Sequence, residues 1–123
     1  MNWLDYKNFE PHEFDCKHSG ENKMRPEFMQ KLQDLRDKFG KPMPINRGYR
    51  SPEHPIEARK TKPGKHAEGI AADIGVRGAD ALKLISLALE LGFTGIGVAQ
   101  KGDSRFIHLD ISTDANRPTI WSY

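Results

Sequence analysis

Strict alternation of side-chain polarity constrains the fold of this chain most. Between residues 69 and 76, every second residue is apolar, which is the period of a half-buried β-strand. The apolar face carries Ile70, Ala72, Ile74 and Val76, and the other face carries Ala71, Asp73 and Gly75. Asp73 therefore projects from the less apolar face, and His66 lies in the turn that leads into the strand.

A second stretch, residues 105 to 111, alternates in the same way. Its apolar face carries Ile107, Leu109 and Ile111, and its other face carries Phe106, His108 and Asp110. If both strands lie in one sheet with their apolar sides together, His66, Asp73 and His108 converge on the opposite side. Two imidazoles and a carboxylate form a good ligand set for zinc, and three protein ligands leave a fourth position for water, as in catalytic zinc sites.

Length and composition limit the possible classes of protein. A chain of 123 residues suits one domain, residues 1–123, with a core that needs no disulfide. Cys16 is the only cysteine and is expected to be a small buried residue. The net charge of +2 is too small to indicate a nucleic-acid binder, and no stretch is long enough to predict membrane insertion. A monomer is expected.

Two helices are predicted from helical periodicity. The first runs from Pro26 to Phe39, where proline suits the first turn and Gly40 suits the end. Its apolar stripe consists of Phe28, Met29, Leu32, Leu35 and Phe39. The second runs over 78–91, and Leu82, Ile85 and Leu89 share one of its sides.

The remaining segments predict short strands and loops. Residues 42–47 suggest an extended segment, and residues 94–100 a strand that forms an antiparallel hairpin with the strand containing His108. Residues 1–24 are expected to wrap the core through Trp3, Leu4, Phe9 and Phe14, and residues 56–65 to form a solvated basic loop. Trp121, in the tail, is expected to cover one end of the core or to border the site. Together these elements predict an α+β fold, a small and mostly antiparallel sheet with helices packed on one face.

Four pieces of this sequence carry a family resemblance. They are Arg47-Gly48-Tyr49-Arg50-Ser51-Pro52, His66-Ala67-Glu68-Gly69-Ile70-Ala71-Ala72-Asp73, Phe106-Ile107-His108-Leu109-Asp110, and Arg117-Pro118 followed by Trp121. In this order and spacing, the chain resembles the zinc D-Ala-D-Ala carboxypeptidase and murein endopeptidase family, in its small single-domain branch. The resemblance extends over nearly the whole chain and implies the fold that the signalling protein hedgehog also uses.

The resemblance implies a zinc hydrolase that acts on peptidoglycan stem peptides, either as a lytic endopeptidase or by trimming the terminal D-alanine. Matched by position, His66, Asp73 and His108 would bind Zn²⁺, and Arg50 would face the substrate. A guanidinium there suits an oxyanion or a carboxylate of the stem peptide equally well. The N-terminus shows no signal peptide, so we expect synthesis in the bacterial cytoplasm and action on the cell wall after release, as for a phage endolysin, or as a virion component.

One departure from the family pattern leaves the general base open. Many members carry Asp or Glu three residues before the last histidine ligand, and others carry histidine two residues before it. Here these positions hold Arg105 and Phe106. The candidates for the base are Asp103, in a turn, and Asp110, which could instead orient an imidazole; Glu68 is more distant. The alternative function is a catalytically inactive zinc module that binds wall peptide or a protein partner.

Overall fold

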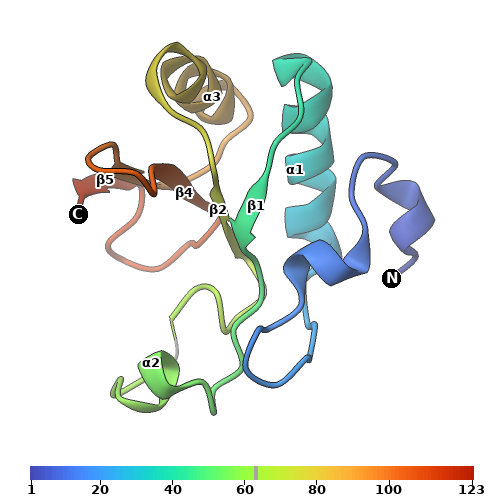
Figure 1. Ribbon diagram of the computed structural model, residues 1–123, viewed down its shortest axis with the longest axis vertical. Helices are drawn as coiled ribbons and strands as arrows, with labels where there is room; N and C mark the ends of the chain where they lie inside the picture. The colour runs from blue at the N-terminus through green and yellow to red at the C-terminus, as the bar shows by residue number, and fades with distance from the viewer. Residues whose placement is uncertain (63) are drawn as a thin grey trace.

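The computed structural model describes residues 1–62 and 64–123, and these form an α+β domain, as predicted (Figure 1). Its strands are β1 (Ile45–Arg47), β2 (Ala71–Ile74), β3 (Gly95–Ala99), β4 (Phe106–Asp110) and β5 (Thr119–Ser122). Its helices are the 3₁₀-helices η1 (Trp3–Asp5) and η2 (Pro11–Phe14) and the α-helices α1 (Pro26–Phe39), α2 (Pro55–Ala58) and α3 (Gly78–Glu90). No helix within the described residues is long and apolar enough to cross a membrane.

The strands form one mixed sheet in the order β1-β2-β4-β3-β5. The β1–β2, β2–β4 and β4–β3 pairs are antiparallel, and β5 runs parallel to β3. The predicted hairpin is therefore confirmed as β3 and β4. In the β2–β4 register, Asp73 lies opposite His108, and Ala72 lies opposite Leu109. Apolar and polar positions of the two strands are thus in phase, as the alternation predicts.

Helices α1 and α3 join the apolar side of the sheet in one core. The predicted stripe of α1 is fully buried, and it packs in the same cluster as Ala72, Ile74, Ile107 and Leu109 of β2 and β4. Gly40 ends α1 with a positive φ of 73°, a conformation that glycine adopts without a Cβ clash. In Figure 1, α2 lies apart from these two helices, at the lower end of the view.

The shared apolar side of α3 that the sequence shows is not the side that the structure buries most. Leu82 and Leu89 are 72% and 61% exposed, whereas Ala81, Leu84 and Ala88 are buried. Both sets recur at helical spacing, so periodicity alone does not separate them. The structure buries Ala81, Leu84 and Ala88, because the small alanine side chains fit where α3 packs against α1 and β4.

Four other expectations need correction. Leu4 is 87% exposed and anchors nothing, while Phe9 and Phe14 are buried as predicted. The expected loop over 56–65 begins within α2, and the tail forms β5, which periodicity did not reveal. Strand β2 is buried on both faces rather than half-buried, because the segments that carry His66 and Trp121 cover its polar side and that of β4.

Two of the leucines of α3, one buried and one exposed, provide a matched test of this packing. We expect Leu84→Ala to lower the free energy of unfolding by about 3 kcal/mol, because it leaves a cavity in the core. Leu82→Ala removes the same atoms from an exposed side chain and should change the free energy of unfolding by less than about 0.5 kcal/mol. Urea titrations of both variants measure the two values. Equal losses of unfolding free energy in the two variants would contradict the orientation of α3.

Candidate metal centre

His66 is held by the turn that precedes β2. Its Nδ1 lies 2.8 Å from the carbonyl oxygen of Gly48, which can only accept, so Nδ1 carries the proton. Its Nε2 is therefore directed at Asp73, 3.3 Å from Oδ1. The turn closes through Gly69, where φ is 76° and a Cβ would collide with the backbone oxygen of Lys23. Glycine is thus required to bring the imidazole to the sheet.

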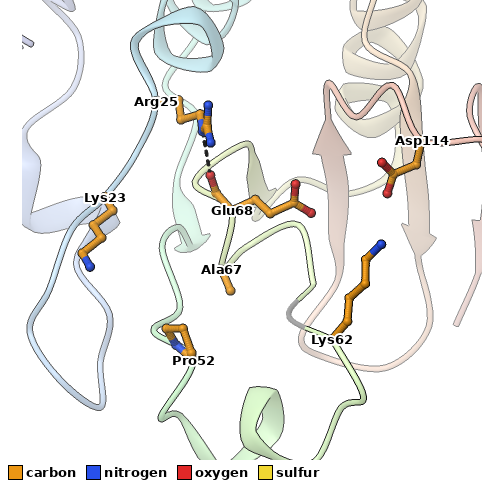
Figure 2. A pocket seen from close by; sticks show the side chains of 7 residues that line it. All are labelled: Lys23, Arg25, Pro52, Lys62, Ala67, Glu68 and Asp114. Carbon is orange, nitrogen blue, oxygen red and sulfur yellow. Dashed lines mark hydrogen bonds between the residues drawn. The ribbon is translucent and has the colours of Figure 1, made fainter.

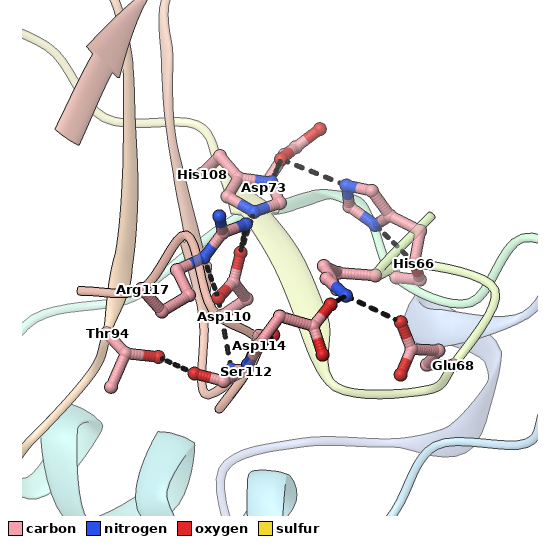
Figure 3. Close-up of polar contacts among 11 residues, drawn as sticks. His66, Glu68, Asp73, Thr94, His108, Asp110, Ser112, Asp114 and Arg117 are labelled. Atoms are coloured by element: carbon pink, nitrogen blue, oxygen red, sulfur yellow. Dashed lines mark hydrogen bonds and ion pairs between the residues drawn. The ribbon is translucent and has the colours of Figure 1, made fainter. Parts of the chain in front are cut away.

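His108, in the middle of β4, is fixed from the other direction. Its Nε2 donates to Oδ2 of Asp110 over 2.8 Å, and its Nδ1 faces Oδ1 of Asp73 at 3.1 Å (Figure 3). Asp110 is completely buried and is itself clamped by Arg117, with Nε 3.1 Å from Oδ1 and Nη2 2.9 Å from Oδ2. The backbone N–H of Ser112 adds a third donor at 3.2 Å. A bidentate guanidinium and a backbone amide therefore fix the carboxylate that orients the imidazole.

Three donor atoms meet at one point of the buried centre. Ligand atoms of His66, Asp73 and His108 all lie within 4.8 Å of one another, so the three residues could hold a metal ion. Oδ1 of Asp73 faces Nε2 of His66 and Nδ1 of His108. The other nitrogen of each ring donates elsewhere, to Gly48 from His66 and to Asp110 from His108, so both nitrogens that face Asp73 are acceptors. Such facing acceptors repel one another unless a cation or a proton lies between them.

The ionisation of the centre reflects this arrangement. Burial raises the pKa of Asp73, but hydrogen bonds and charge from His108 and His66 outweigh it and hold the pKa well below its usual range. Burial lowers the pKa of His108, and its contacts with Asp110 and Asp73 raise it above the ordinary value. The centre therefore keeps its carboxylates ionised and stabilises positive charge among them, as a site for a cation requires.

Two glycines of β3 make room for this arrangement. A Cβ on Gly95 would overlap the carboxylate of Asp110, and a Cβ on Gly97 would meet the Trp121 ring and Cβ of His108. The Trp121 ring lies 5.1 Å from that of His108, and the guanidinium of Arg117 lies 4.9 Å from the Trp121 ring. The tail therefore borders the site, one of the two positions expected for Trp121.

A cavity of about 280 Å³, which we call the metal cavity, opens onto the three candidate ligands. Cationic and aromatic side chains form its walls. Besides His66, Asp73 and His108, its lining residues are Arg47, Arg50, Lys60, Lys65, Phe106, Arg117, Trp121 and Tyr123. Such a lining suits a ligand that carries negative charge and apolar groups.

Arg50 is buried and lines this cavity together with the three candidate ligands, and its Nη1 donates to Oε2 of Glu57 over 3.0 Å. The side chain of Glu57 is fully enclosed and also accepts from Nζ of Lys60 at 2.9 Å and from the backbone N–H of Gly64 at 2.7 Å. Glu57 was not among the residues that the sequence predicted for the site. The available signal was that it is the only carboxylate between residues 56 and 65, a stretch rich in cations.

The two candidates for the base lie in different surroundings. Asp110 contacts His108 and Arg117, whereas Asp103 is exposed in the turn between β3 and β4 and is not among the lining residues of the metal cavity. Glu68 is exposed and pairs with Lys65. Cys16 is buried, as expected; burial raises the pKa of its thiol, but hydrogen bonds from Ser51 and Ser19 lower it to about 6.

Replacing Glu57 with glutamine should destabilise the protein by about 3 kcal/mol, because it leaves Arg50 without its buried partner. Burial raises the pKa of Glu57, but the Gly64 amide, Lys60 and Arg50 lower it below 4.5 overall. The ionised carboxylate therefore stabilises the fold above pH 4.5, and this stabilisation is lost as the pH falls through the lower folded-state pKa. Urea titrations at pH 7 and pH 3 should show a smaller difference between wild type and variant at pH 3. Exposed Glu53 provides the control, Glu53→Gln, and an equal effect of both substitutions would refute the role of Glu57.

Comparison with known proteins places this centre in a family. A search of curated proteins finds no match to the chain. The family model described as peptidase M15 matches residues 7–110, which include His66, Asp73 and His108 and the Asp110 carboxylate that orients His108. The resemblance found in the sequence is thereby confirmed: the chain belongs to the peptidase M15 family, the family of zinc D-Ala-D-Ala carboxypeptidase-like enzymes.

Proposed function

We propose that this protein is a zinc-dependent peptidase that hydrolyses peptidoglycan stem peptides, by cutting within the stem or by trimming its terminal D-alanine. The observation that carries the proposal is the convergence of His66, Asp73 and His108 beside Arg50 in a chain of a peptidase family. The substrate lies in the bacterial cell wall, so the proposed place of action is the wall, whether the protein comes from a phage or a bacterium.

The donor set supports zinc as the metal. Two imidazole nitrogens and one carboxylate oxygen are typical ligands of catalytic zinc. The two contacts of Asp73 Oδ1, at 3.3 Å and 3.1 Å, are close to the ligand–ligand separation in a zinc tetrahedron. Zinc–ligand bonds of about 2.0–2.1 Å give tetrahedral edges of about 3.3 Å. When bound, zinc supplies Lewis acidity that polarises a scissile carbonyl and acidifies a water molecule.

The protein's own groups account for substrate binding. Arg50 uses Nη1 for Glu57, and a guanidinium has further N–H groups with which to bind a carboxylate or a developing oxyanion. Because Glu57 is buried and bound by three donors, Arg50 is held in one orientation before substrate arrives. Phe106 and Trp121 provide apolar walls for the peptide.

The contacts of Asp110 favour a positioning role over that of general base. Oδ1 accepts from Arg117 and Ser112, and Oδ2 accepts from Arg117 and His108. With these donors on both oxygens, the carboxylate is suited to holding His108 with Nδ1 directed at the metal. Asp103 is therefore the candidate that we propose for the proton transfer, in a turn that leads into Phe106 of the metal cavity.

One observation supports the alternative, a catalytically inactive zinc module that binds wall peptide or a protein partner. Among the described residues that line the metal cavity, Asp73 is the only carboxylate, and it is a proposed ligand. Such a module would bind metal and peptide without turnover. Both functions therefore predict binding of metal and peptide, and only the peptidase predicts cleavage of the peptide.

Metal content of the purified protein tests the basis of both functions. We expect about one zinc per chain after reconstitution, and His66→Ala should lose the metal together with stem-peptide cleavage. His12→Ala, at an exposed histidine, should retain both. Elemental analysis and mass spectrometry of digested stem peptides give the two readouts. If the wild-type protein binds no metal, both functions are refuted. If it binds zinc but cleaves no stem peptide, the peptidase is refuted and the inactive zinc module is the function that agrees with the data.

Asparagine substitutions separate the proposed roles of Asp110 and Asp103. Asp110→Asn should weaken zinc affinity by about 10–100-fold, because the orienting partner of His108 loses its charge. Asp103→Asn should leave zinc affinity unchanged and lower kcat. Competition with a chelator measures affinity, and stem-peptide hydrolysis measures kcat. Unchanged affinity in Asp110→Asn would contradict its positioning role, and full kcat in Asp103→Asn would exclude it as the base.

A further inference from the structure

We propose that a second cavity, beside the metal cavity, binds the carboxylate-bearing part of a peptide substrate that lies away from the bond to be cut. This inference rests on the proposed function. The cavity, which we call the basic cavity, has a volume of about 500 Å³ and is lined by Lys23, Arg25, Pro52, Lys62, Ala67, Glu68 and Asp114 (Figure 2). Pockets for small ligands typically measure about 300–1,000 Å³.

The two cavities share a wall made of side chains. Lys65 lines the metal cavity, and its ammonium contacts Glu68 at 2.9 Å and also pairs with Asp114. Both of these carboxylates line the basic cavity, and Figure 3 shows them beside the metal ligands. In sequence, Ala67 and Glu68 directly follow the ligand His66. A peptide bound at the metal centre can therefore continue past Lys65 into the basic cavity.

The charges of the basic cavity favour an anionic ligand. Its two carboxylates, Glu68 and Asp114, already contact Lys65, so their negative charge is partly neutralised. Lys62 and Lys23 are exposed cations of the lining, and Figure 2 shows the ammonium of Lys62 directed toward Asp114. A ligand carboxylate that enters between these cations gains their attraction without displacing a buried pair.

Arg25 adds a guanidinium in a fixed position. Its Nε donates to the backbone oxygen of Glu68 over 3.2 Å, and its backbone N–H donates to the oxygen of Gly69 over 2.9 Å. These bonds attach the N-terminal segment to the turn that carries His66, and they leave the terminal nitrogens of the guanidinium for other acceptors. Pro52 and Ala67 add apolar surface. A stem peptide carries both carboxylates and small aliphatic side chains, so it matches this lining.

Charge reversal at the rim tests the inference. In the double variant Lys23→Glu/Lys62→Glu, isothermal titration calorimetry with a stem pentapeptide should show affinity at least about tenfold weaker than wild type, since like charges now face the ligand. Affinity for the D-alanyl-D-alanine dipeptide, which ends within the metal cavity, should not change. The matched control is Lys38→Glu/Lys101→Glu, two exposed lysines outside both cavities that give the same change in net charge. It should bind both peptides like wild type.

Binding is measured on the full chain without added metal, so it does not depend on cleavage. Equal pentapeptide affinity in the two double variants would overturn the inference, as would a wild type that binds the pentapeptide no more tightly than the dipeptide. Hydrolysis by zinc-loaded wild type is scored separately. If binding follows the expected pattern and no bond is cut, the proposed peptidase activity fails and the basic cavity remains a peptide-binding site.

Discussion

The antiparallel pairing of β2 with β4 is the constraint on which the rest of the structure depends. It sets Asp73 opposite His108 on one face and Ala72 opposite Leu109 on the other. If β2 stays in place, a shift of β4 by one residue would turn His108 into the core and Leu109 out of it. The helices α1 and α3 stabilise this register by burying the apolar face, so the core that holds the fold together also determines the geometry of the metal centre.

The remaining polar groups of the centre come from segments that lack strong periodicity. The turn before β2 supplies His66, the segment after β1 supplies Arg50, and the tail supplies Arg117 and Trp121. Each is fastened by specific bonds, such as His66 to Gly48 and Arg117 to Asp110. Functional residues often lie on loops that a rigid scaffold positions, and here the sheet positions two of the three candidate ligands while the loops supply the rest of the site.

The sequence predicted the parts of the site that alternation controls. Asp73 and His108 lie on strands whose period fixes the direction of their side chains, so their convergence followed once the strands paired. Glu57 did not follow, because α2 is a single turn and no periodic pattern marks its buried carboxylate. The buried side of α3 did not follow either, because α3 has two apolar stripes, and the choice between them depends on how closely α1 packs. Strand β5 was missed because its residues, apart from Trp121, pair at the edge with little burial.

Buried carboxylates control the charge of the metal cavity. Three of them each pair with an arginine that lines it: Asp73 with Arg47, Glu57 with Arg50, and Asp110 with Arg117. The arginines are therefore oriented by carboxylates that are almost inaccessible to solvent. Because a guanidinium has five N–H groups, an incoming carboxylate can bind without breaking the buried pair. In the pair of Asp110 with Arg117, where the guanidinium bonds both carboxylate oxygens, a lysine would lose this bidentate geometry and with it the fixed orientation.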